Sequence, residues 1–264
     1  MIVEFLGTSG AGKSTLIPIL IKLLHDDGLT AMSATEAIHF YMRKTWVGRL
    51  VCSLVPQALQ GPILWRVFSW FILKFSIAKF AMENPRLTSY VVKSQLHRPI
   101  PWRHRWLILS LFFEMAGWYQ FLKYRLQQNE ALIFDEGFVH RATHIFVSES
   151  EPLYAEQIAS YLEWIPRSDL VIWVQAPLDA CLARIYSRGL QVRLRNLETS
   201  GVTRFLANAE QVVNITAQYL SEIGYNVIQV ENNSDLTTST SELRRQLSKY
   251  LYGISTHLKH SPLD

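Results

Sequence analysis

Residues 7–14 constrain this sequence more than any other feature, because they match the pattern G-x-x-x-x-G-K-[ST] of a phosphate-binding loop. The glycines of such a loop let backbone N–H groups curl around phosphates. Lys13 can then reach the outer phosphates, and the hydroxyl of Ser14 can hold Mg²⁺. The residues that we expect to bind ATP with Mg²⁺ are Gly7, Thr8, Ser9, Gly10, Ala11, Gly12, Lys13, Ser14 and Thr15.

The segments on both sides of this loop have the pattern that the motif requires. Residues 2–6 are a short apolar run, which predicts a strand, and apolar residues at helical spacing predict a helix over 14–25. The positive end of that helix would add to the attraction for phosphate. Gly28 predicts a left-handed cap, and residues 29–34 follow as a second strand. Strand, loop, helix and strand in this order form a βαβ unit.

Strands and helices alternate along the second half of the chain. Apolar runs predict strands at 131–134, 169–174 and 225–230, and helices are predicted at 153–164, 178–188, 202–223 and 238–251. This alternation predicts an α/β fold with a mainly parallel sheet of about five strands, flanked by helices on both faces. The chain has 264 residues, 49% of them hydrophobic, which is enough for one such domain over 1–264.

A large helical insertion at about 37–128 interrupts this alternation. Breaks between its helices are predicted at Pro56, Gly61-Pro62, Asn84-Pro85 and 99–101. Within it, residues 40–128 contain 13 Lys and Arg residues and two acidic residues, a net charge of +11, whereas the whole chain carries +4. Six of the eight tryptophans also fall in this segment.

This basic, aromatic segment at 40–128 has three interpretations. The first is a helical substrate lid whose tryptophans form part of the core, and the second is a site for an anionic acceptor. The third is a peripheral membrane surface, since Trp, Leu and Lys or Arg together suit a bilayer interface. The two most apolar stretches, 63–80 and 107–122, are interrupted by charged residues and are too short to predict a transmembrane helix. We find no nucleic-acid-binding motif.

Asp135 follows the buried strand at 131–134, where an acidic partner for Mg²⁺ is expected. Ligands bind beyond the carboxyl ends of parallel strands, and the phosphate loop and Asp135 both lie at such ends. The alternative is a cap for the turn after the strand. Glu136 can accept a proton from an attacking hydroxyl group or only orient a cation, and both roles stay open.

Four arginines fall within a short stretch after the fourth predicted strand. Arg184 and Arg188 share one helix face, and Arg193 and Arg195 follow in a polar loop, so that residues 184–200 are predicted to form an arginine-rich lid. Positive charge stabilises a phosphoryl group during its transfer, and a mobile loop can supply that charge after water has been excluded. The alternative is a solvated helix end, where arginines complement the helix dipole.

His140 and His144 stand four residues apart beside Asp135, which is a spacing found at metal sites. No third ligand is visible in the sequence. We therefore interpret both histidines as ordinary polar helix residues.

These motifs resemble the P-loop kinases of small molecules, the nucleoside and nucleotide kinase group that includes thymidylate and deoxynucleoside kinases. The resemblance covers residues 7–14, 133–137, Arg141 and 176–189. It implies that the last stretch leads into a helix and an arginine-rich lid, and that Arg141 holds substrate or phosphate. It also implies that Glu36, just after the second strand, lies near the acceptor hydroxyl group.

The sequence thus predicts a Mg²⁺- and ATP-dependent phosphotransferase that acts on a small acceptor, such as a nucleoside, a nucleotide or a sugar. The alternative is a nucleotide-hydrolysing switch or a regulatory ATPase at a membrane surface. A GTPase is disfavoured because no N-K-x-D motif occurs. An enclosed pocket facing Ser14 would favour a kinase, and an exposed apolar, basic face would favour a membrane or partner role.

The cellular location and the assembly of the chain are further expectations. No basic region precedes the first apolar run, so we expect no signal peptide. The two cysteines, Cys52 and Cys181, lie in no metal or redox motif, which favours a reduced, cytoplasmic protein. Association with a membrane and a homodimer stay open as alternatives.

Overall fold

A five-stranded parallel sheet with the strand order β2-β3-β1-β4-β5 lies at the centre of the structure. The computed structural model describes the chain except for residues 148–154, 191–193, 196, 234 and 260–264. The strands are β1 (Ile2–Leu6), β2 (Thr30–Ser33), β3 (Glu130–Phe134), β4 (Leu170–Gln175) and β5 (Val227–Glu231). In the central strand, Val3 pairs with Ile133 of β3 and with Leu170 of β4. The predicted parallel sheet of about five strands is therefore confirmed.

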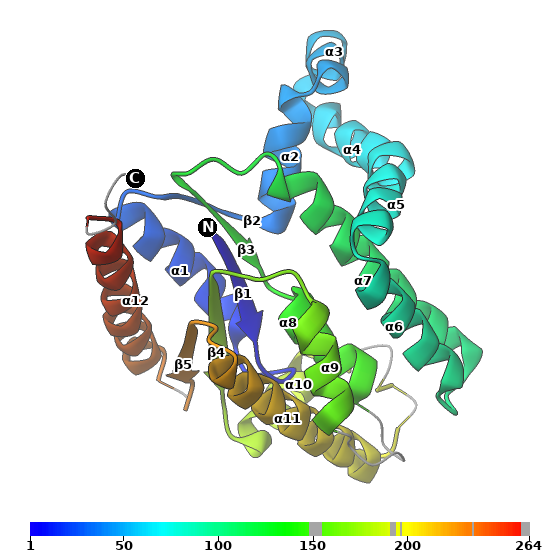
Figure 1. The fold of residues 1–264 in the computed structure, drawn as a ribbon, viewed down its shortest axis with the longest axis vertical. Helices are drawn as coiled ribbons and strands as arrows, with labels where there is room; N and C mark the ends of the chain where they lie inside the picture. The colour runs from blue at the N-terminus through cyan, green and yellow to red at the C-terminus, as the bar shows by residue number, and fades with distance from the viewer. Residues whose placement is uncertain (148–154, 191–193, 196, 234, 260–264) are drawn as a thin grey trace.

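Helices cover both faces of this sheet, as Figure 1 shows. Helices α1 (Lys13–Asp26) and α12 (Leu236–Lys259) pack on one face, against Val3 and Phe5. The opposite face carries Leu6, because successive side chains of a strand point to opposite sides. The helices on that side are α8 (Phe138–Phe146), α9 (Ala155–Trp164) and α11 (Thr199–Glu222). Helix α10 (Leu178–Arg188) lies near the phosphate loop, with Cys181 of α10 against Gly10.

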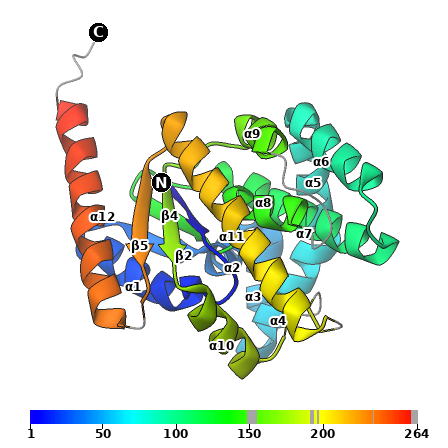
Figure 2. The ribbon, with the colours of Figure 1, turned by 90° about the horizontal axis from the view of Figure 1, so that it is seen from below.

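The insertion between β2 and β3 is helical, as the sequence predicts. Its elements are α2 (Ala34–Lys44), α3 (Trp46–Leu54), α4 (Gln57–Val67), the π-helical turn η1 (Phe68–Ile72), α5 (Leu73–Glu83), α6 (Pro85–His97) and α7 (Trp102–Lys123). This helical block lies on the side of the molecule away from α12 in both Figure 1 and Figure 2. Helix α7 runs back toward the sheet and contacts α2, α5, α6 and α8.

One feature of the helices differs from the sequence prediction, and another was predicted only in part. The break expected at Gly61-Pro62 is wrong, because α4 runs through Pro62. A proline inside a helix leaves the carbonyl four residues earlier without its partner. Here that carbonyl belongs to Ala58, and both Ala58 and Pro62 are exposed, so water can bind the carbonyl. Helix α8 was predicted without bounds, through the interpretation of His140 and His144 as helix residues, and it follows directly after Asp135-Glu136-Gly137.

The strand order places a crevice beyond the carboxyl ends of β1 and β3. The chain leaves β1 toward the edge strand β2, and it leaves β3 toward β4 on the other side of β1. The connections after β1 and β3 therefore run in opposite directions, on opposite faces of the sheet, and ligands bind at such a position in sheets of this kind. The phosphate loop follows β1, and Asp135 follows β3, so both lie at this crevice.

Candidate active site

The loop between β1 and α1 has the backbone conformation that its sequence predicts. Gly10 and Gly12 have φ angles of 83° and 99°, which is the left-handed region that glycine adopts without strain. Helix α1 begins directly after Gly12 with Lys13, and Thr15 donates its backbone N–H to Gly12. The loop therefore ends at the positive end of a helix, which is a position that attracts anions.

Side chains from distant parts of the chain hold this loop. The side-chain amide of Asn232, at the end of β5, donates to the carbonyl of Ala11 at 2.7 Å. Arg184 of α10 donates to the carbonyl of Gly10 at 3.0 Å and to that of Asn232 at 3.4 Å. Thr8 lies 3.5 Å from the thiol of Cys181. Sequence reasoning did not identify Asn232, although its place after a buried strand was a usable signal.

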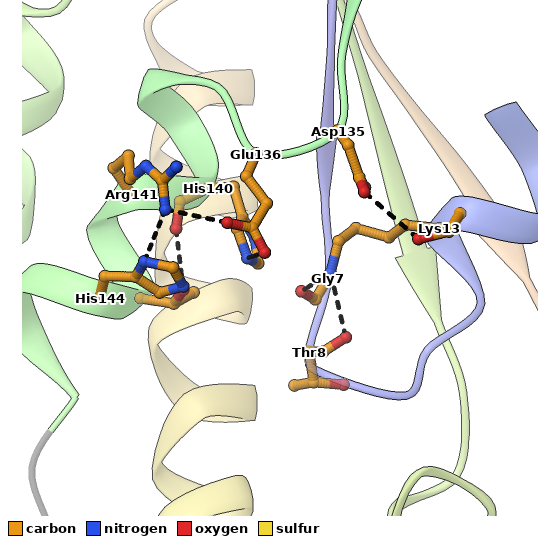
Figure 3. Close-up of polar contacts among 10 residues, drawn as sticks. Gly7, Thr8, Lys13, Asp135, Glu136, His140, Arg141 and His144 are labelled. Atoms are coloured by element: carbon orange, nitrogen blue, oxygen red, sulfur yellow. Dashed lines mark hydrogen bonds and ion pairs between the residues drawn. The ribbon is translucent and has the colours of Figure 1, made fainter. Parts of the chain in front are cut away.

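Lys13 is buried, and its ammonium group folds back onto the loop. Its Nζ donates to the carbonyls of Gly7 at 2.9 Å and Thr8 at 3.2 Å (Figure 3). Burial lowers the pKa of Lys13, and the nearby carboxylates of Asp135 and Glu136 oppose that shift. The ammonium group of Lys13 therefore donates its hydrogen bonds to loop carbonyls in this structure. Phosphate oxygens are acceptors of the same kind and can take the place of these carbonyls.

The hydroxyl of Ser14 donates to Oδ2 of Asp135 at 3.2 Å, across the crevice between β1 and β3. The other carboxylate oxygen, Oδ1, is buried and has no hydrogen-bond partner among the described residues. Burial raises the pKa of Asp135, and Lys13 opposes that shift. A hydroxyl and a carboxylate with an unused oxygen are hard donors of the kind that Mg²⁺ prefers, so these residues fit the ion.

Glu136, on the other side of the crevice, forms an ion pair with Arg141 of α8 at 2.9 Å. The same guanidinium nitrogen lies 2.8 Å from Nδ1 of His144 (Figure 3). Burial alone would raise the pKa of Glu136, but the charges of His144, Arg141 and Lys13 outweigh it and hold the pKa below its ordinary value. Glu136 is therefore ionised at neutral pH.

The structure supplies the third group that the sequence did not reveal beside His140 and His144. Ligand atoms of Glu136, His140 and His144 lie within 4.8 Å of one another. However, Arg141 already contacts Glu136 and His144, and a cation between these groups disfavours a metal ion there. His140 is not a surface residue, since it is 3% exposed and burial lowers its pKa well below the ordinary value.

Two cavities meet at the carboxylates that follow β3. The first, which we call the phosphate cavity, has a volume of about 280 Å³ and contains the loop, Arg184 and Arg188. The second, the acceptor cavity, has a volume of about 300 Å³ and lies between α7 and the ends of β2 and β3. Asp135 and Glu136 line both cavities. Apart from these two acids, the acceptor cavity is lined by Ile17, Ser33, Ala34, Thr35, Leu111, Glu114, Met115, Trp118, Ile133, Phe134 and Arg141.

The acceptor cavity has two polar side chains from α7 that sequence reasoning missed. Glu114 is half-buried, and Trp118 has a buried indole Nε1 without a partner among the described residues. Glu114 belongs to no motif in the sequence, and only the fold brings it into the same cavity as Asp135. Helical spacing places Glu114 and Trp118 on one face of α7, which was the available signal.

Glu36 has a local partner at the start of α2. Its carboxylate accepts hydrogen bonds from the backbone N–H and the hydroxyl of Ser33, and Ser33 in turn caps the N–H of Glu36. This reciprocal arrangement is a capping box, which stabilises the first turn of a helix. Glu36 is exposed, and the acceptor cavity is lined by its neighbours Ala34 and Thr35.

The arginines predicted to form a lid lie in different places. Arg184 and Arg188 line the phosphate cavity. Arg195 is exposed and donates to the carbonyl of Leu190 at 3.1 Å. Arg193 lies outside the described residues, as do parts of the predicted lid over 184–200.

Comparison with known proteins finds solved structures that are similar to this chain. No family model and no curated protein matches the chain. Three structures of deoxyadenosine kinase from M. mycoides are similar to it over 94% of this chain. The structure with bound dCTP has 12% identity, 100% of that chain covered and a TM-score of 0.43. The structure with the products dCMP and a flexible dCDP has 14% identity, 99% of that chain covered and a TM-score of 0.45. The structure with bound dATP has 14% identity, 99% of that chain covered and a TM-score of 0.49.

The chain has a P-loop kinase-like fold. The parallel sheet, the glycine-rich loop after its central strand and the helix that begins at Lys13 are the observations behind this statement. The fold that the motif resemblance implied is thus confirmed, and a functional proposal has to rest on the loop, the carboxylates and the two cavities.

Proposed function

We propose that this chain is an ATP-dependent phosphotransferase that moves the γ-phosphoryl group to a hydroxyl or phosphate group of a small acceptor. A nucleoside, a nucleotide and a sugar are the acceptor classes that we consider. One observation carries the proposal: the phosphate cavity and the acceptor cavity share Asp135 and Glu136. A donor in one cavity and an acceptor in the other would therefore meet at these carboxylates, which is the arrangement that group transfer requires.

The phosphate cavity would hold the polyphosphate of ATP. Backbone N–H groups of the loop and the ammonium of Lys13 are the donors, and Arg184 and Arg188 add positive charge from α10. Positive groups that are already in place stabilise the charge of the transferring phosphoryl group without reorganisation. Arg184 is also bonded to the loop carbonyl of Gly10, so its position is coupled to that of the loop.

Ser14 and Asp135 are the residues that we assign to Mg²⁺. When bound, the ion would neutralise negative charge on the phosphates of the nucleotide. Burial raises the pKa of Asp135 despite the opposing charge of Lys13, and a divalent cation bound at the unpartnered Oδ1 would favour the ionised carboxylate.

The acceptor cavity combines apolar walls with a few polar groups, as small-molecule sites commonly do. Glu136 is fixed by its ion pair with Arg141, which suits it to accept a hydrogen bond or a proton from an acceptor hydroxyl group. Glu114 and the indole N–H of Trp118 are further groups that can hold the acceptor. We propose that Glu136, Glu114 and Trp118 contact the acceptor. We assign Glu36 a different role, the capping of helix α2.

The proposal is tested by phosphoryl transfer from labelled ATP to nucleosides, nucleotides and sugars. Lys13→Ala should lower transfer at least about 100-fold, because the developing charge loses its nearest cation. Lys22→Ala is the matched control, since Lys22 is an exposed lysine on the same helix. Full activity of Lys13→Ala would show that the role assigned to Lys13 is wrong.

A nucleotide-hydrolysing regulator at a membrane surface is the second candidate. It is favoured by the exposed apolar and basic residues of the helical block, which a soluble acceptor does not require. ATP hydrolysis that proceeds at the same rate with every acceptor, and that gives labelled inorganic phosphate but no labelled acceptor, would support this candidate over the phosphotransferase.

A further inference from the structure

The six tryptophans of the helical block divide into two groups. Trp65 and Trp118 pack into the interior against α2 and β3. The other four have exposed fractions between 62% and 79%, and they are Trp46, Trp70, Trp102 and Trp106. The interpretation of this segment as a lid with a tryptophan core therefore covers two of the six, and the exposed four need another explanation.

A stripe of exposed apolar side chains runs along η1 and α5. Phe71, Phe75 and Met82 are 71–73% exposed, and their spacings of four and seven residues place them on one face of the helix. The opposite face packs inward, with Phe80 buried in the core and Leu73 and Ile77 against Gly117 of α7. Since both faces are apolar, packing within the chain explains only one of them, and the second face is suited to an external apolar partner.

Helix α3 also carries a stripe of exposed apolar side chains. Trp46, Leu50 and Leu54 follow one another at spacings of four residues and are 52–79% exposed. Gly48 is the one buried residue of this helix. At the start of α7, the rings of Trp102 and Trp106 stack on each other at 6.2 Å instead of packing into the core.

Basic side chains accompany these apolar stripes. Lys74 is exposed beside Phe75, and its ammonium lies 5.5 Å from the ring of Trp70. Arg49 is exposed on α3 and Arg103 on α7, each next to exposed apolar residues. The net charge of +11 over residues 40–128 therefore surrounds the stripes with a positive potential.

We propose that the exposed stripes of α3, η1, α5 and the start of α7 bind the surface of an anionic lipid bilayer. Tryptophan favours the interface between headgroups and acyl chains, and each lysine or arginine near the surface is attracted to anionic lipid. An acidic protein would use the charge, but it does not require two separate stripes of large apolar side chains together with four exposed tryptophans. Within the described residues, no helix combines the length and hydropathy needed to cross a bilayer, so binding is to the surface.

This inference does not depend on the phosphotransferase proposal, because vesicle binding needs neither ATP nor an acceptor. The full chain is mixed with phosphatidylcholine vesicles that contain about 30% phosphatidylglycerol and with vesicles of phosphatidylcholine alone, and bound protein is measured by co-sedimentation. Binding should require the anionic lipid and should decrease as salt is added. In vesicles with brominated acyl chains, tryptophan fluorescence should be quenched.

Phe71→Ser/Phe75→Ser should weaken vesicle binding at least about tenfold, because two large apolar side chains are no longer available to move from water into the bilayer interface. Tyr252→Ser is the matched control, because Tyr252 is 74% exposed on α12, on the other side of the molecule. The thermal unfolding and ATP binding of both variants establish that each is folded. Trp46→Ser on α3 provides a second variant in case the double substitution does not fold.

Three outcomes would overturn the proposal. The first is the absence of vesicle binding by the full chain, and the second is equal binding to neutral and anionic vesicles. The third is a dimer of the full chain in size-exclusion chromatography with light scattering that Phe71→Ser/Phe75→Ser converts to monomer. That result would assign the stripes to a second copy of the chain.

Discussion

The carboxylate of Glu4 in β1 accepts a hydrogen bond of 2.7 Å from the backbone N–H of Val139, in the first turn of α8. Glu4 is 1% exposed, and Gly137 leaves room for its side chain, since a Cβ there would lie 2.3 Å from Oε2 of Glu4. The strand that leads into the phosphate loop is thus bonded to the helix that carries Arg141. The positions of the loop and of Arg141 are coupled through this buried acid.

Glu4→Gln should change the pH dependence of stability. Burial raises the pKa of Glu4 from 4.5 to about 7, so between these pH values the folded chain holds a proton that the unfolded chain lacks. The stabilisation by protonated Glu4 is present in full below pH 4.5 and is lost as the pH rises through about 7. The loss is on the order of 3 kcal/mol, and Glu4→Gln should not show it.

Urea unfolding of both proteins at pH 5 and pH 8 measures this difference. The comparison with Glu4→Gln is needed because buried His140, whose pKa is lowered, shifts stability in the opposite direction. An equal pH dependence of the two proteins would contradict the titration of Glu4.

Gly12→Ala should destabilise the chain and weaken ATP binding. A Cβ at Gly12 would lie 2.0 Å from Nδ2 of Asn232, and the φ angle of 99° is strained for alanine. Gly28→Ala separates these two effects, because Gly28 also has a positive φ, 84°, but nothing lies within 4 Å of its Cβ position. Gly28→Ala should lower the free energy of unfolding by about 1–2 kcal/mol and leave ATP affinity unchanged.

Thermal unfolding and calorimetric titration with ATP check this pair of variants. Gly12→Ala should be the less stable one, and its ATP affinity should fall at least about tenfold, because Asn232 must move and no longer holds the carbonyl of Ala11. Equal effects of both variants would mean that the contact with Asn232 does not position the loop.

Asp135→Asn should remove the dependence of ATP binding on Mg²⁺. An amide keeps the size of the side chain and its contact with Ser14, but it lacks the charge that a divalent ion requires. ATP affinity is measured with Mg²⁺ and with EDTA, for the full chain, for Asp135→Asn and for Asp27→Asn, an exposed acid after α1. If Asp135→Asn bound ATP more tightly with Mg²⁺ than with EDTA, by the same factor as the unchanged chain, the metal role of Asp135 would be wrong.

Glu114→Gln should raise the KM for the acceptor identified by the transfer screen, and leave the KM for ATP unchanged. Glu114 lines the acceptor cavity but not the phosphate cavity. Loss of one charged hydrogen bond to the acceptor corresponds to an increase of roughly tenfold. Glu210→Gln, a half-buried glutamate on α11 outside both cavities, is the control for a general effect of removing a charge.

The sequence predicts the phosphate loop and the alternation of strands and helices because both are local patterns. The spacing of the motif identifies residues 7–14 as the phosphate loop, and apolar runs identify the strands β3 and β4. The contact between Ser14 and Asp135 follows from the fold, since parallel strands end at the same edge of the sheet. The capping box at Ser33 and Glu36 has its own local signature, S-x-x-E, which competes with a role for Glu36 at the acceptor.

Other parts of the site depend on distances that a single sequence does not contain. Asn232 contacts Ala11 across 221 positions of the chain, and Glu114 reaches the acceptor cavity through the course of α7. The composition of the helical block likewise cannot separate Trp65, which is packed inside, from Trp70, which is exposed. Both have apolar and basic neighbours in sequence, and only the packing of α4 and η1 distinguishes them.

The register of β1 has a consequence for the synthesis of the chain on the ribosome. Ile2 pairs with Leu132 and Val3 with Leu170, so the first strand has both of its neighbours far downstream. We expect β1 to leave the ribosome before either neighbour and to wait until β3 and β4 have been translated before it can join the sheet. The phosphate loop, which β1 anchors, would therefore acquire its shape only after these two strands have been made.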